Sequence, residues 1–91
     1  MSNEAPDIPL ELKIKYIERR KKDLLICDSA LIAEDYKFFE RIGHDLKGNA
    51  ITFGHSFLAT LGEELELAAK AKKIVLIKDL ILRYSDYIAN L

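Results

Sequence analysis

The chain has 91 residues, of which 49% are hydrophobic and 32% are charged, and its formal net charge is −1. A chain of this length is expected to form one domain with one modest core. A net charge so close to zero gives no overall attraction to nucleic acid or to an anionic membrane. The single cysteine, Cys27, excludes an internal disulfide, and we expect it to be a small core residue.

The sequence opens with no charged leader before an apolar stretch, and no apolar run approaches the length of a membrane span. We therefore expect a cytoplasmic protein. Residues 1–9 are polar and contain both prolines of the chain, which predicts a flexible N-terminal segment. A single domain is expected over residues 10–91.

The first expected helix runs from Leu10 to about Leu31 and ends near residues 32–34. Its apolar residues keep roughly one face and comprise Ile14, Ile17, Leu24, Cys27 and Leu31. Residues 18–23 are a run of mixed charge. This run is either a solvated helix face or a basic rim that steers an acidic partner.

A second helix is predicted to begin after Asp35, whose carboxylate can cap free backbone amides. It is expected to run to Thr52 or Phe53, and Gly54 fits the left-handed position that follows a helix end. Apolar residues recur along it at helical spacing and form one stripe, which comprises Phe39, Ile42, Leu46, Ala50 and Phe53.

A third helix is expected to start at His55 or Ser56, with Ser56 as a plausible cap. Its apolar residues are Phe57, Leu58, Leu61, Leu65, Ala68 and Ala69. Gly62 permits close approach of a neighbouring helix, and residues 70–73 form a basic link. A fourth helix has the apolar residues Ile74, Ile77, Ile81, Tyr84, Ile88 and Leu91. Because no strand alternation is present, the predicted fold is all-α, an antiparallel four-helix bundle.

One histidine in the second helix lies opposite the apolar stripe. His44 is about 160° from the centre of the stripe and should face outward. Lys47 is one turn later on the same side, and Gly48 lies above the histidine. A glycine inside a helix costs about 1 kcal/mol relative to alanine. Gly48 therefore suggests that a large group approaches His44, although a tolerated glycine beside a solvated face explains the spacing as well.

These residues resemble the motif of the histidine-containing phosphotransfer (HPt) family. The motif is a helix with His-x-Leu-Lys-Gly and a small residue, followed by a glycine at the helix end and a leucine-rich helix. The matching residues here are His44, Leu46, Lys47, Gly48 and Gly54. The resemblance is good from Asp35 to Ala69 and loose over the first helix. It departs at Asn49, where many members have Ser, Thr or Ala.

The resemblance implies a domain that holds a phosphoryl group on His44 between receiver aspartates. Lys47 would stabilise phosphoryl charge, and Gly48 would give the partner clearance. An imidazole of ordinary pKa, about 6.5, is mostly neutral at pH 7 and needs no base to attack phosphorus. The sequence has no glycine loop for nucleotide phosphates and no carboxylate cluster near the histidine. We therefore expect no cofactor and no autokinase activity, with Mg²⁺ on the partner receiver.

Helical projection places five other side chains near His44, namely Lys37, Glu40, Arg41, Lys47 and Ile51. Arg41 would assist Lys47 in offsetting phosphoryl charge. Glu40 would orient the imidazole or, as we favour, pair with a neighbouring cation. Partner contacts are expected at Lys37, Arg41 and Ile51. The second histidine, His55, lacks a matching lysine and glycine, and we expect it to be a helix-start residue.

We therefore expect a monomeric phosphocarrier of a two-component phosphorelay. Its partners would be receiver domains of response regulators or of a hybrid histidine kinase, with no nucleic acid and no membrane. The alternative is a non-catalytic helical module that binds receivers and whose histidine is incidental. A third possibility is the dimerisation helix pair of a histidine kinase. It would need a self-complementary apolar face and an attached ATP-binding domain, and the sequence shows neither.

Overall fold

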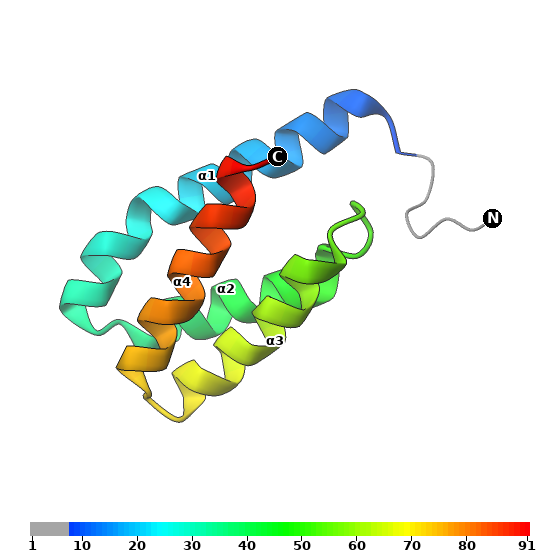
Figure 1. Cartoon of the computed structure of the whole chain (residues 1–91). Helices are drawn as coiled ribbons and strands as arrows, with labels where there is room; N and C mark the ends of the chain where they lie inside the picture. The colour runs from blue at the N-terminus through cyan, green and yellow to red at the C-terminus, as the bar shows by residue number, and fades with distance from the viewer. Residues whose placement is uncertain (1–7) are drawn as a thin grey trace.

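The computed structural model describes residues 8–91, and this part of the chain contains four helices and no strand. They are α1 (Leu10–Ala33), α2 (Tyr36–Asn49), α3 (Ser56–Lys70) and α4 (Ile74–Ala89). The helices form one bundle in which α2 packs most extensively on α3, and α4 contacts both α3 and α1 (Figure 1). The predicted all-α, antiparallel four-helix bundle is confirmed. The expected flexible segment falls mostly on residues 1–7, which lie outside the described residues.

The connection between α1 and α2 follows the prediction closely. α1 ends at Ala33, and the next residue, Glu34, has a left-handed backbone with a φ of 51°. The backbone N–H of Asp35 donates to the carbonyl oxygen of Ala30 at 2.9 Å, which closes the turn. The Asp35 side chain then accepts a hydrogen bond from the backbone N–H of Phe38 at 3.1 Å. The predicted cap of α2 is therefore confirmed.

The predicted extent of α2 was wrong by about one turn. α2 ends at Asn49, and residues 50–54 form a tight turn. In that turn the N–H of Gly54 donates to the carbonyl oxygen of Ile51, and the N–H of His55 donates to that of Ala50, both at 2.9 Å. This pair of bonds needs a left-handed residue between them, and Gly54 supplies it with a φ of 87°. The predicted role of Gly54 is confirmed.

The core consists of the predicted apolar faces with three exceptions, of which the first is Ile14 on α1, at 50% exposed. The stripe of α2 is buried at Phe39, Ile42, Leu46 and Ala50, and Cys27 is buried as well. Phe57, however, is 47% exposed because it stacks on the outer side of Tyr87, with ring centroids 5.0 Å apart. Leu91 is 60% exposed because it lies beyond the end of α4.

Most of the charged run on α1 is exposed, as the alternative of a solvated face predicts, but Arg20 within it is buried. Arg20 is only 8% exposed, and its Nε lies 2.9 Å from Oδ2 of Asp23. The fully buried Tyr84 of α4 donates from its hydroxyl to the same Asp23 oxygen at 3.4 Å. Buried charges are tolerated when they are paired. The contacts among Arg20, Asp23 and Tyr84 connect α4 to α1 inside the bundle.

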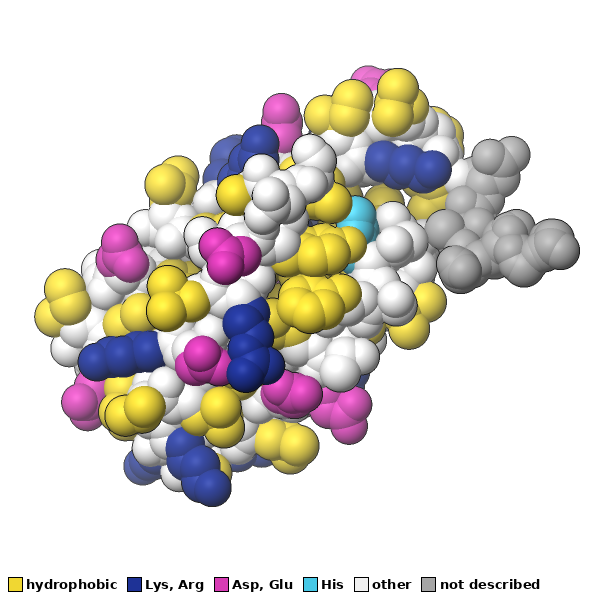
Figure 2. Space-filling model, in the orientation of Figure 1, with side chains coloured by type: hydrophobic (Ala, Val, Ile, Leu, Met, Phe, Trp, Pro, Cys, Tyr) yellow, Lys and Arg dark blue, Asp and Glu magenta, His cyan; other side chains and the backbone are white. Residues whose placement is uncertain are grey.

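The outer surface mixes side chains of different kinds. On the face shown in Figure 2, lysines and arginines, acidic residues and hydrophobic residues are interspersed. Within residues 8–91, no helix combines the length and the hydrophobicity that crossing a membrane would require.

Candidate functional site

The predicted outward orientation of His44 is confirmed. Its side chain is 69% exposed, near the middle of α2. Lys47, one turn later, is 45% exposed. A Cβ atom added to Gly48 would meet no atom within 4 Å outside its own helix turn, so the space beside this glycine is open. These three residues share one accessible side of α2.

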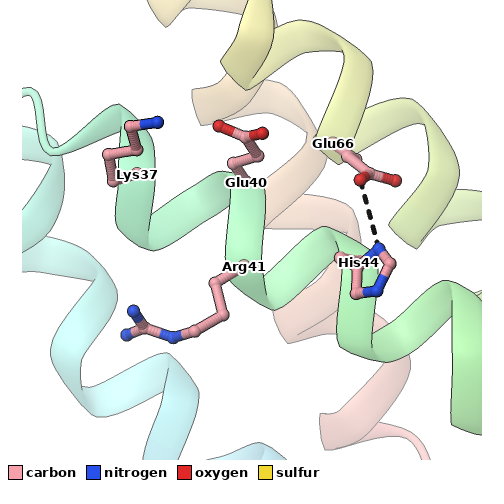
Figure 3. Close-up of a pocket in the computed structure, with 5 residues that line it drawn as sticks. All are labelled: Lys37, Glu40, Arg41, His44 and Glu66. Atoms are coloured by element: carbon pink, nitrogen blue, oxygen red, sulfur yellow. Dashed lines mark hydrogen bonds and ion pairs between the residues drawn. The ribbon is translucent and has the colours of Figure 1, made fainter.

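The imidazole is held by a residue of the facing helix that the sequence did not single out. Nδ1 of His44 lies 3.3 Å from Oε2 of Glu66 on α3, and the two side chains point toward one another (Figure 3). The Glu66 side chain is only 9% exposed. The sequence offers Glu40 for this role, because Glu40 is one turn before His44 on the same helix. Glu40 makes no ion pair within residues 8–91, so its favoured pairing with a cation is also absent.

Glu66 also forms ion pairs with two lysines. Nζ of Lys47 lies 3.0 Å from Oε1 of Glu66, and Nζ of Lys70 lies 3.6 Å from Oε2. The hydrogen bond from Lys47 lowers the pKa of the Glu66 carboxyl below its ordinary value, although burial acts in the opposite direction. Glu66 is therefore ionised at neutral pH and serves as a shared anion for one imidazole and two ammonium groups.

Two glycines bring Glu66 within reach of α2. A Cβ on Gly43 would lie 2.5 Å from the backbone nitrogen of Glu66 and 2.6 Å from the carbonyl oxygen of Gly62. A Cβ on Gly62 would lie 2.8 Å from the carbonyl oxygen of Gly43. The backbones of α2 and α3 therefore touch at this level, as predicted for Gly62. The short separation lets a glutamate on α3 contact His44, which follows Gly43 in the chain.

The contact with Glu66 decides which ring nitrogen of the neutral His44 side chain carries the proton. An ionised carboxylate can only accept hydrogen bonds, so Nδ1 must carry the proton of the neutral ring. The lone pair then resides on Nε2, the nitrogen on the other side of the ring. Since most of the side chain is exposed, Nε2 is available to an electrophile from outside the protein.

The side chains predicted around His44 are brought together only in part. Lys37, Glu40 and Arg41 line an open hollow of about 380 Å³ together with His44 and Glu66. Figure 3 shows Arg41 pointing away from the imidazole, and its guanidinium lies 5.8 Å from the centre of the Phe38 ring. The predicted contribution of Arg41 to charge at His44 is therefore not supported by this geometry.

Ile51 lies differently from the helical projection, and Asn49, where the family motif has another residue, contacts α1. Ile51 is 55% exposed, but it belongs to the turn after α2, because the helix ends at Asn49. The side-chain oxygen of Asn49 accepts a hydrogen bond from the Tyr16 hydroxyl at 2.7 Å. Asn49 therefore ties α2 to α1.

His55 belongs to an aromatic cluster at the end of the bundle. Its ring is stacked on Tyr16, with centroids 5.9 Å apart, and its Nδ1 lies 2.7 Å from the hydroxyl oxygen of Tyr87. Burial lowers the pKa of His55. The residue precedes α3, as predicted, but the helix starts at Ser56, so the expected cap by Ser56 is wrong.

Comparison with protein-family models, with curated proteins and with solved structures finds no match to this chain. Within residues 8–91, no group of three or more histidine, cysteine or acidic side chains is arranged to hold a metal ion.

Proposed function

We propose that this protein is a histidine phosphocarrier of the HPt type, which receives a phosphoryl group from a receiver aspartate on His44 and passes it to another receiver. The observation that supports this proposal is the contact between the exposed His44 ring and the nearly buried Glu66 carboxylate. This contact leaves Nε2 unprotonated and fixes the ring direction. An incidental surface histidine needs no such partner.

The chemistry requires one displacement at phosphorus. The Nε2 lone pair of His44 attacks the phosphorus of an aspartyl phosphate, an N–P bond forms, and the P–O bond to the aspartate breaks. The aspartate leaves as a carboxylate. The Nδ1 proton stays on the ring, where Glu66 balances the positive charge that develops on the imidazole. Transfer to the next receiver is the reverse reaction.

The partner would supply what this chain is not expected to provide. Phosphoryl transfer needs its charge neutralised and its atoms in line, and a receiver domain would bring Mg²⁺ and an activated aspartyl phosphate. The open space beside Gly48 suits the approach of such a partner. Lys37 and Ile51 are exposed on either side of His44 along the chain. We propose that both residues contact the partner receiver. We further propose a monomer that acts in the cytoplasm without autokinase activity.

The test is transfer of radiolabel from a phosphorylated receiver with Mg²⁺, compared among the wild type, His44→Gln and His55→Gln. We expect His44→Gln to take no label and His55→Gln to take most of it. ATP and Mg²⁺ without a kinase should give no label. Label retained by His44→Gln would contradict the proposal. Receiver binding without transfer in the wild type would favour a non-catalytic interaction module instead.

A further inference from the structure

The last residue of α3 brings a second cation to the site from outside the motif on α2. Nζ of Lys70 lies 3.6 Å from Oε2 of Glu66, the same oxygen that accepts from Nδ1 of His44. The Lys70 side chain is 54% exposed. Helical projection along α2 does not reveal this lysine, because it belongs to the facing helix.

The two lysines around Glu66 are held unequally. Nζ of Lys47 lies 3.0 Å from Oε1 of Glu66, which is hydrogen-bond distance, and does not share this oxygen with His44 or Lys70. Lys70 lies 3.6 Å from Oε2 and shares that oxygen with His44, so its contact is an ion pair without a short hydrogen bond. Moving Lys70 away from Glu66 therefore costs less than moving Lys47, and Glu66 would still retain one cation.

The site has an unbalanced charge before any phosphoryl group arrives. One carboxylate, Glu66, faces the two ammonium groups of Lys47 and Lys70. The other charged groups that line the hollow are one anion, Glu40, and two cations, Lys37 and Arg41. A phosphoryl group on His44 would bring about two negative charges, and a flexible lysine that is half exposed can turn toward them.

We infer that Lys70 is the cation that pairs with the phosphoryl oxygens when Nε2 of His44 is phosphorylated, and that Lys47 acts mainly by holding Glu66 against the imidazole. This inference rests on the proposed function. It assigns a direct contact to a residue of α3 and a positioning role to the lysine of the motif. Lys70→Gln and Lys47→Gln should therefore change different observables.

The experiment uses phosphoramidate, a small donor that needs no partner protein. Nε2 attacks its phosphorus, the N–P bond of the donor breaks, and ammonia leaves. The phosphorylated wild type, Lys70→Gln, Lys70→Arg and Lys47→Gln are followed by ³¹P NMR over a pH titration. The control variant is Lys78→Gln, which removes the same charge from the exposed surface of α4. Circular dichroism establishes that each variant is folded.

We expect Lys70→Gln to raise the pKa of the phosphoryl group and to slow labelling about two- to fivefold, the range that exposed ion pairs produce. Lys70→Arg and Lys78→Gln should match the wild type. Lys47→Gln should alter the ¹⁵N signals of the His44 ring more than the phosphoryl pKa.

A phosphoryl pKa that Lys70→Gln leaves unchanged and Lys47→Gln raises would overturn the inference while leaving the proposed function intact. Absence of label at His44 in the wild type, with this donor and with a phosphorylated receiver, would overturn both.

Discussion

At the residue scale, the orientation of the His44 ring depends on a side chain from another helix. Glu66 holds Nδ1 and thereby leaves the lone pair of the neutral ring on Nε2. Gly48 adds no contact and contributes empty space. α2 therefore presents one residue whose ring is held by a neighbouring helix and one position without a side chain.

Replacing Gly48 by leucine separates folding from transfer. Leucine favours a helix more than glycine, and an added Cβ has open space, so we expect the melting temperature to stay the same or rise. Transfer from a receiver should fall by about 10²-fold, because a displacement of about 1 Å disturbs the reacting geometry that much. Thermal melting and transfer rate are measured on one sample. Unimpaired transfer would show that the open space is not needed.

At the element scale, the contact between α2 and α3 determines which residues meet at the site. Gly43 and Gly62 let the two backbones touch, and this contact fixes the register in which Glu66 faces His44. Any side chain at either glycine must push the helices apart. The packing of two glycines is thus coupled to the chemistry of the neighbouring imidazole.

The same substitution at two glycines of α2 should have opposite effects on stability. Gly43→Ala places a Cβ against backbone atoms of α3, which we expect to lower the free energy of unfolding by about 1–3 kcal/mol. Gly48→Ala has open space and should raise it by up to about 1 kcal/mol. Urea denaturation of both variants provides the comparison. Equal stability of the two would contradict the close helix contact.

The sequence reveals those features of the site that depend on a single helix. Helical spacing predicts the exposed His44 and the bare position at Gly48, and both are observed. It does not reveal Glu66 or Lys70, because their contacts with α2 depend on how far two helices approach and in which register. Gly62 signalled close packing, but a sequence pattern alone does not tell which residue of the other helix it faces.

Helix ends were predicted with less success for a similar reason. Apolar spacing continues through Phe53, yet α2 ends at Asn49, because hydrogen bonds to Ala50 and Ile51 close a turn. The left-handed Gly54 allows that turn to form. A local pattern of apolar residues therefore overestimated the helix, and Ile51 lies in a turn instead of on the helix face.

At the scale of the whole molecule, the bundle has a polar group inside, formed by Arg20, Asp23 and Tyr84, and an aromatic cluster at one end. The cluster joins α1 to α4 through Tyr16, His55 and Tyr87, at the turn that follows the helix of His44. Burial disfavours the charged form of His55 and lowers its pKa. A second hollow, distinct from the one at His44, lies beside the His55 ring. Lys13, Glu18 and Lys21 on α1 line it.

This burial predicts an acid-dependent loss of stability. The pKa of His55 is lower in the folded chain than its ordinary value of about 6.5. The stability that neutral His55 contributes to the fold is therefore complete above the ordinary pKa. It is lost as the pH falls through the lower pKa of the folded chain. We expect the free energy of unfolding to decline in this range for the wild type and His44→Gln, and to decline less for His55→Phe. An equal decline in all three would assign the effect to other groups.

The most direct test of the account identifies the atom that becomes phosphorylated. Protein with ¹⁵N-labelled histidines is phosphorylated by a receiver, and a correlation between ¹⁵N and ³¹P shows which ring nitrogen is bonded to phosphorus. Because Glu66 occupies Nδ1, the account predicts a bond to Nε2 of His44. Phosphorus on Nδ1 of His44, on His55 or on no nitrogen would contradict it.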